Sequence, residues 1–392
     1  MSKFKVLLWK YYLYRVLIHI HFFSGVLVPF FTDWGGITFT QVMILQSWFM
    51  FWIFALEIPT GSVADYFGRK YSIALGCFAH ALGCVIYVIA PQFLVFLIAE
   101  FLMALGMSLI SGANEAFIYD SLVEIKEEHQ SKKIFARAES FGLSGIMISA
   151  PIGSWMASLW GLQSTMFLTT FPTLLGGFIA LSFKEPKLYT EQKEKKYFSI
   201  LKEGTKYFLH HKILKVLAFD MILIQSVAYF MIWLYQPKLQ SIYFNIVYFG
   251  LVHASFVLSQ TVMMNYFEKL EKIFRSKKRL IFLTSFLTGC FFLLTGFTNM
   301  IVPTLLGIIL GGGIGLSRRP ILISYMNKHI PSHQRATILS CVSMMRTFML
   351  VIINPFVGYL ASQYLNTTFI VLGSFALLFS LASKVQEEHL LD

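Results

Sequence analysis

The amino-acid sequence predicts an all-α integral membrane protein with twelve transmembrane helices arranged as two six-helix bundles. The first observation behind this prediction is composition: hydrophobic residues make up 56% of the 392 residues, and only 13% are charged. A soluble chain carries about 25% charged residues, so this balance is typical of a protein embedded in lipid. The second observation is a series of twelve apolar stretches, each long enough to cross a bilayer as a helix of about 20 residues.

These stretches fall into two groups of six, which the longest polar segment of the chain separates. In the first half we predict spans at 11–32, 38–60, 71–90, 93–119, 138–160 and 162–183. In the second half we predict spans at 213–236, 246–267, 279–298, 301–326, 337–360 and 364–384. The predicted domains are therefore an N-terminal bundle at 1–183, a linker with an amphipathic helix at 184–212, and a C-terminal bundle at 213–392.

The distribution of basic residues predicts the orientation in the membrane. Most of the 32 Lys and Arg lie in the N-terminus, in the loops that follow even-numbered spans, or in the C-terminus. By the positive-inside rule, both termini are expected on the cytoplasmic side of a multi-pass protein of the inner (cytoplasmic) membrane. Because these charges are spread over several loops without a soluble domain, they argue against a nucleic-acid partner.

The most specific motif lies between the second and third spans. Gly61, Asp65, Gly68, Arg69 and Lys70 form the pattern G-x-x-x-D-x-x-G-R-K. A turn this short needs glycines where backbones approach closely, and charges that stay at the membrane surface. The pattern and its position resemble the signature loop of the major facilitator superfamily. This resemblance implies the twelve-helix fold of that family and a transporter that works by alternating access, not an enzyme.

The resemblance also implies a gate on the cytoplasmic side. In relatives, the loop Asp caps the eleventh helix in the other half, and the loop Arg pairs with an acid at the end of the fourth helix. The corresponding residues here are Asp65, Arg69 and Asp120. The equivalent loop of the second half, 268–279, keeps basic residues but lacks the Gly and Asp, so we expect only one strong latch.

Charged residues inside spans are candidates for coupling or substrate binding, because a charge is costly to place in a membrane. Glu100 shares one helix face with Met107 and Asn114, and it is the first candidate for a proton-binding acid. Asp220 in the seventh span and Arg346 in the eleventh are a plausible pair, with a structural and a substrate role equally open. The other polar candidates within spans are Glu57, His19, Gln225 and Tyr229.

The sequence does not predict a metal site or a cofactor. His19 and His21 are two residues apart, so on a helix they would point to nearly opposite sides and could not bind one metal together. The four cysteines lie within predicted spans and form no CxxC pair. Arg318 and Arg319 in the tenth span could bind an anion or anchor the helix end.

The absence of a nucleotide-binding loop or a hydrolase motif indicates that transport draws on an ion gradient. Gly142 to Gly153 weakly resembles a motif of antiporters. We therefore predict proton-coupled efflux of an amphipathic small molecule by a monomer whose partners are substrate, protons and lipids. The alternatives are proton-coupled uptake of a nutrient or metabolite, and lipid flipping.

Overall fold

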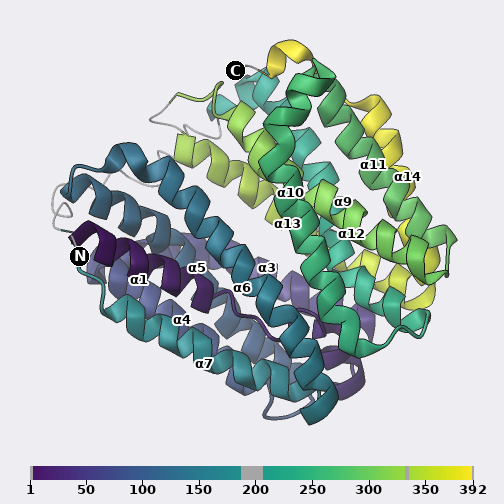
Figure 1. The fold of residues 1–392 in the computed structure, drawn as a ribbon, viewed down its shortest axis with the longest axis horizontal. Helices are drawn as coiled ribbons and strands as arrows, with labels where there is room; N and C mark the ends of the chain where they lie inside the picture. Colours follow the sequence, from purple (N-terminus) through teal and green to yellow (C-terminus); the bar gives the residue numbers. More distant parts are fainter. Residues whose placement is uncertain (1–2, 187–205, 332–334, 391–392) are drawn as a thin grey trace. The chain divides into compact units, whose positions relative to one another are not determined.

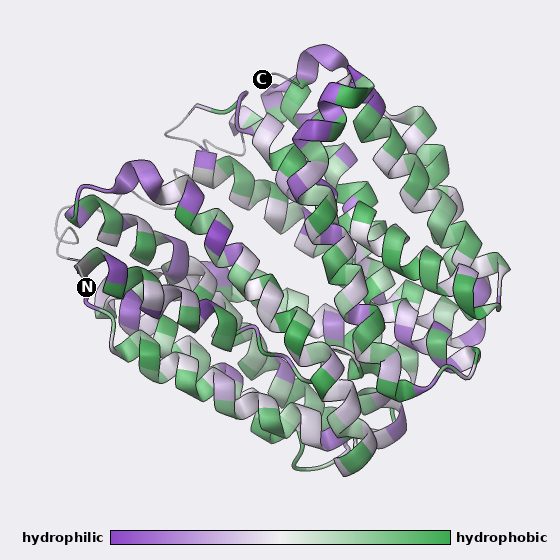
Figure 2. Cartoon of the chain, in the orientation of Figure 1, coloured by the Kyte–Doolittle hydropathy of each residue, from purple (hydrophilic) through white to green (hydrophobic). Residues whose placement is uncertain are grey.

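The computed structural model describes residues 3–186, 206–331 and 335–390, which fold into long helices (Figure 1). Within these ranges, eleven helices are long and apolar enough to cross a membrane. Their bounds agree to within a few residues at most ends with eleven of the twelve predicted spans. Hydrophobic residues cover most of their length, and hydrophilic residues gather at many helix ends (Figure 2). The helical membrane fold predicted from the sequence is therefore confirmed.

The described residues form two compact units. The first contains 3–186 together with 245–254, and the second contains 206–244 and 255–390. The long helices of the first unit are α1 (Lys3–Leu17), α3 (Phe39–Phe67), α4 (Arg69–Tyr87), α5 (Phe93–Glu124), α6 (Ser131–Trp160) and α7 (Leu162–Leu181). The remaining long helices are α9 (Lys212–Ser241), α10 (Phe249–Phe274), α11 (Lys277–Phe297), α12 (Ile301–Met326), α13 (Arg335–Gln363) and α14 (Leu365–Ala382). The amphipathic helix predicted for the linker falls largely on 187–205, outside the described residues.

The first predicted span, 11–32, is not one continuous helix. Helix α1 ends at Leu17, the chain then runs through turns over 18–26, and it resumes as the short α2 (Leu27–Pro29) and a π-helical turn, η1 (Phe30–Trp34). Two backbone amides in the break donate to hydroxyls of other helices, His21 to Ser149 Oγ at 3.0 Å and Phe22 to Thr169 Oγ1 at 3.2 Å. These hydroxyls supply hydrogen bonds that the interrupted helix lacks.

Close helix contact in the first unit depends on small residues. Helix α4 packs against both α5 and α7 (Figure 1). Gly76 of α4 faces Gly106 of α5, and a Cβ added at Gly106 would lie 2.6 Å from the Gly76 carbonyl oxygen. Side chains larger than hydrogen would push the two helices apart, so these glycines fix how closely α4 and α5 approach.

The second unit has its own apolar core. One cluster of buried residues joins the beginning of α9 to α11, α12 and α13, and includes Leu214, Leu217, Leu280, Leu322 and Ile338. Helix α11 also packs against α14 and α12. The second unit is therefore held together by contacts among helices distant in sequence.

We expect Gly106→Ala to destabilise the first unit by about 1–3 kcal/mol, because the added methyl group has no room against the α4 backbone. The matched control is Gly112→Ala on the same helix, where the nearest atom to an added Cβ is 4.0 Å away. Thermal unfolding of the purified variants measures the difference. Equal melting temperatures for the two variants would contradict this account of the α4–α5 contact.

Candidate functional site

The motif between α3 and α4 is mostly helical. The sequence analysis ended the second span at residue 60, but α3 continues to Phe67 and α4 begins at Arg69. Only Gly68 separates them, with φ at +100°, a backbone conformation that glycine adopts without strain. Gly61 and Asp65 thus belong to α3, and the side chain of Asp65 lies outside what the structure describes.

The Arg of the motif makes the contact that the family resemblance implies. Arg69 forms an ion pair with Asp120 near the end of α5, and both side chains are largely buried. One turn further along α5, Glu124 pairs with Lys184 at 3.2 Å, just after α7. The end of α5 is thus linked by charge to the start of α4 and to the chain that follows α7.

A carboxylate that the sequence analysis did not identify caps the start of α4. Glu185 Oε1 accepts a hydrogen bond from the Arg69 backbone N–H at 2.7 Å, and Oε2 accepts one from the Lys70 N–H at 3.0 Å. The first backbone N–H groups of a helix have no partner within the helix, and the helix dipole favours a negative charge beside them. Glu185 therefore ties the end of the sixth span to the beginning of the third.

The second unit repeats this arrangement without repeating the motif. Glu387, five residues after α14, accepts hydrogen bonds from the backbone N–H groups of Lys277 and Lys278 at 2.7 and 2.9 Å. It also accepts one from the Ser276 hydroxyl at 2.7 Å. Because these residues begin α11, Glu387 connects the ninth and twelfth spans as Glu185 connects the third and sixth. This second link is not apparent from the sequence, because the loop before α11 lacks the Gly and Asp of the motif.

The surroundings of Glu387 lower the pKa of its carboxyl group. Partial burial raises this pKa, but the hydrogen bonds from Ser276, Lys278 and Lys277, with the positive charge of Lys277, lower it by more. The stabilising effect of the carboxylate is therefore present above the pKa of an unfolded Glu, about 4.3. It is lost as the pH falls through the lower pKa of the folded state.

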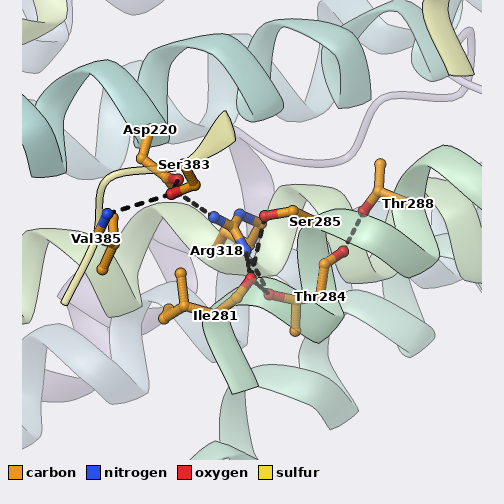
Figure 3. A network of polar contacts seen from close by, with 8 residues as sticks. All are labelled: Asp220, Ile281, Thr284, Ser285, Thr288, Arg318, Ser383 and Val385. Atoms are coloured by element: carbon orange, nitrogen blue, oxygen red, sulfur yellow. Dashed lines mark hydrogen bonds and ion pairs between the residues drawn. The ribbon is translucent and has the colours of Figure 1, made fainter. Parts of the chain in front are cut away.

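Asp220 is part of a buried network in the second unit, shown in Figure 3. Asp220 on α9 is paired with Arg318 on α12, and the side chains are 2% and 0% exposed. The second oxygen of Asp220 accepts a hydrogen bond from Ser383 Oγ at 2.7 Å. Arg318 also donates to the Ile281 carbonyl at 2.5 Å and to the Thr284 hydroxyl, both on α11.

This network corrects the pairing expected from the sequence, in which Arg346 was the partner of Asp220. Arg318 is the partner of Asp220 because α9 packs directly against α12. Each of the two charges needs a partner of opposite sign once it is removed from water. A fully buried ion pair with further hydrogen bonds favours a structural role for Asp220. The Nε atom of Arg346 is buried and has no hydrogen-bond partner among the described residues.

Glu100 differs from Asp220 in having only uncharged partners in the described structure. Glu100 is only 5% exposed. Gln46 Nε2 on α3 donates to Glu100 Oε1 at 2.9 Å, and the Tyr87 hydroxyl at the end of α4 makes a second hydrogen bond. Phe96, one turn earlier on α5, belongs to an aromatic cluster with Phe30, Phe31, Trp34 and Tyr87. Because Tyr87 is also a hydrogen-bond partner of Glu100, the carboxyl group lies beside this cluster.

The residues predicted to share a helix face with Glu100 have different surroundings. Met107 is 49% exposed, whereas Asn114 is 6% exposed. Glu57 is half-buried in α3. Only Glu100 therefore combines deep burial with a carboxyl group among the candidates on α3 and α5.

The break in the first span rearranges the histidines. Because 18–26 is not helical, the rings of His19 and His21 do not point apart but stack with centroids 6.1 Å apart. The His80 ring on α4 lies 6.0 Å from that of His21. His19 Nδ1 donates to the Arg15 carbonyl and His21 Nε2 to the Ile18 carbonyl. Within the described ranges, no group of three His, Cys, Asp or Glu side chains could hold a metal ion.

Buried polar groups in the second unit remain available for a ligand. Gln225 on α9 and Asn354 on α13 are 5% and 0% exposed. In the part of the chain that the structure describes, Gln225 Oε1 and both side-chain polar atoms of Asn354 have no hydrogen-bond partner. Tyr229, one turn after Gln225, is also buried. Buried side-chain atoms without a hydrogen-bond partner, like those of Gln225 and Asn354, are rare in native proteins that hold no ligand. The sequence analysis named Gln225 and Tyr229 but missed Asn354.

Long apolar helices in two units, with ion pairs inside and at the ends of the spans, define a multi-pass α-helical membrane protein. The sequence profile of the Major Facilitator Superfamily matches residues 18–353. The chain therefore belongs to this superfamily and is a membrane transporter of its fold. No curated protein matches the chain.

Solved structures share the fold at low sequence identity. The nucleoside transporter NupG superposes with a TM-score of 0.77 at 12% identity, covering 98% of this chain and 100% of that chain. A POT family transporter in complex with 5-aminolevulinic acid gives 0.77 at 14% identity, covering 98% and 96%. The D-xylose–proton symporter gives 0.77 at 12% identity, covering 98% and 99%. These likenesses support the fold alone.

Replacing Asp220 by Asn should lower the free energy of unfolding by about 3–5 kcal/mol, because the positive charge of Arg318 would remain buried without its counter-ion. The double variant Asp220→Asn, Arg318→Gln should recover part of this loss. Thermal unfolding of the purified variants measures both, with Ser383→Ala as a control that loses one hydrogen bond, about 1 kcal/mol. If the loss of unfolding free energy in the double variant equals the sum of the losses in the two single variants, Asp220→Asn and Arg318→Gln, the coupling is refuted.

Replacing Glu387 by Gln should lower the melting temperature above about pH 5, and this effect should fade as the pH falls through the lowered pKa of the native carboxyl group, below which that group is itself protonated. Melting curves of the purified protein across this pH range measure the difference. Glu388→Gln is the neighbouring control, since its carboxylate caps no helix. If the loss of melting temperature in Glu387→Gln does not change with pH, the negative charge of the capping carboxylate is excluded as its cause.

Proposed function

We propose that the protein is a proton-coupled secondary transporter that exports an amphipathic small molecule by alternating access, and that Glu100 carries the coupling proton. The observation that carries this proposal is the environment of Glu100, a deeply buried carboxyl group whose hydrogen-bond partners among the described residues are an amide and a phenol. Burying a negative charge without a cation is costly, which favours the neutral acid while the site is closed to water. Entry of water would then release the proton.

The charge links around α4 support a gating role for the motif. Arg69, Asp120 and Glu185 join three chain segments at one end of the first unit. A helix-end carboxylate contributes about 0.3–1 kcal/mol, and somewhat more when partly buried. Links of this size can be broken when substrate or a proton favours the other state. By the positive-inside rule, we expect this end and both chain termini on the cytoplasmic side of the inner membrane.

The unpartnered side-chain atoms of Gln225 and Asn354 in the second unit support a binding role for these two residues. They lie on α9 and α13, at positions within the membrane-spanning part of the chain. A substrate with hydrogen-bonding groups would satisfy them. Uptake of a nutrient or metabolite with protons is the second candidate function, because the same acid and the same polar groups serve either direction of transport. We expect a monomer, since one chain contains both bundles.

Glu100→Gln should abolish the dependence of transport on the proton gradient, because the amide cannot release a proton in this pH range. The measurement is accumulation of fluorescent amphipathic dyes of either charge, ethidium included, in cells that express the protein, with and without a collapsed proton gradient. Glu115→Gln is the matched control, an exposed acid four turns further along α5. Lowered dye accumulation indicates export, and raised accumulation indicates import. The proposal is wrong if transport by the intact protein is indifferent to the gradient.

A further inference from the structure

A pocket of about 600 Å³ lies in the first unit between α1 and α6. These helices pack side by side, as Figure 1 shows. The volume falls within the range of about 300–1,000 Å³ that is usual for small-molecule sites. None of the residues assigned above to proton coupling or to the gate lines this pocket, so its ligand can be considered separately from them.

One part of the pocket wall is aromatic. Trp9 and Tyr12 come from α1, and Phe141 comes from α6. The rings of Tyr12 and Phe141 are stacked with their centroids 4.9 Å apart and their planes at 25°. Trp9 is 67% exposed. Flat aromatic walls of this kind favour a ligand that itself contains a planar ring, because ring faces can stack on them.

The charged groups that line the pocket among the described residues are both positive. They are Lys5 of α1 and Arg137 of α6. The acidic residue nearest to Arg137 in the sequence is Glu139. It forms an ion pair with Arg15 at 2.9 Å and does not line the pocket. An ammonium and a guanidinium beside one cavity favour an anion, and the planar guanidinium suits a carboxylate, phosphate or sulfonate.

Exposed hydroxyl groups complete the lining. Ser140 and Ser144 are one turn apart on α6, and both are exposed within the membrane-spanning part of that helix. A polar stripe on a spanning helix is disfavoured against lipid and is expected to face water or other protein. The pocket is therefore expected to face water or other protein and not lipid.

We propose that this pocket binds the transported molecule and that the molecule is an anion with an aromatic ring. The ring stacks on Tyr12, Phe141 and Trp9, and the anionic group binds Arg137 and Lys5. The inference rests on the proposed function, because it names the substrate class of the proposed transporter. It does not depend on the direction of transport or on the role of Glu100.

The test compares ligands that share a ring and differ in charge. Naphthalene-2-sulfonate and naphthalen-2-ylmethylammonium are titrated by calorimetry into the purified full-length protein in nanodiscs of zwitterionic lipid. The anion should bind at least about tenfold more tightly than the cation, a difference of about 1.4 kcal/mol. Arg137→Gln should remove most of this preference, and Phe141→Leu should weaken the binding of both probes.

Lys133→Gln is the matched control, because Lys133 is exposed on the same helix one turn before Arg137 and does not line the pocket. Melting temperatures of all variants check that folding is intact. Equal binding of the two probes, no binding of the anion, or unchanged anion binding in a folded Arg137→Gln variant would overturn the proposal. The titration needs no proton gradient, so its failure is distinguishable from a failure of the coupling role of Glu100.

Discussion

The interior of a membrane offers no water to polar groups, and this constraint explains most of the polar contacts in the structure. Each buried charge or interrupted helix needs a partner that the protein itself provides. Arg318 finds one carboxylate, one hydroxyl and one carbonyl. The amides of His21 and Phe22, which lie in the broken first span, find hydroxyls on α6 and α7. Among the described residues, Glu100 has hydrogen-bond donors but no cation as partners, and in this respect it differs from Asp220.

Helix ends are governed by the same constraint at the membrane surface. In each unit, a glutamate that follows the last span caps the start of the third helix of that bundle, Glu185 at α4 and Glu387 at α11. The two turns themselves differ, since Gly68 takes a positive φ in one and Arg275 in the other. The capping geometry is thus repeated where the sequence motif is not. In each bundle, the third helix is thus hydrogen-bonded to the chain that follows the last helix of the same bundle. Because these links lie within one bundle, they favour movement of that bundle as one body.

Much of the fold could be predicted from the sequence, and some of the candidate site could not. Length and hydropathy are properties of single segments, so eleven spans were located within a few residues at most ends. The contact of Arg69 with Asp120 was expected from a family resemblance. The pairing of Asp220 with Arg318 depends on which helices are neighbours, and several basic residues were possible partners. The roles of Glu185 and Glu387 could not be predicted, because the sequence does not distinguish a carboxylate that caps another helix from any other charged residue at a helix end.

The break after Leu17 bears on how the chain enters the membrane during synthesis. Helix α1 has 15 residues, equivalent to about 22 Å, less than the roughly 30 Å of the hydrocarbon layer. It also contains Lys10 and Arg15, and Arg15 pairs with Glu139 of α6. The hydroxyls that bond to the break reside on α6 and α7, which are made more than a hundred residues later. These two hydrogen bonds can therefore form only after the fifth and sixth spans have been made, so the break in the first span receives its partners from the last helices of the N-terminal bundle.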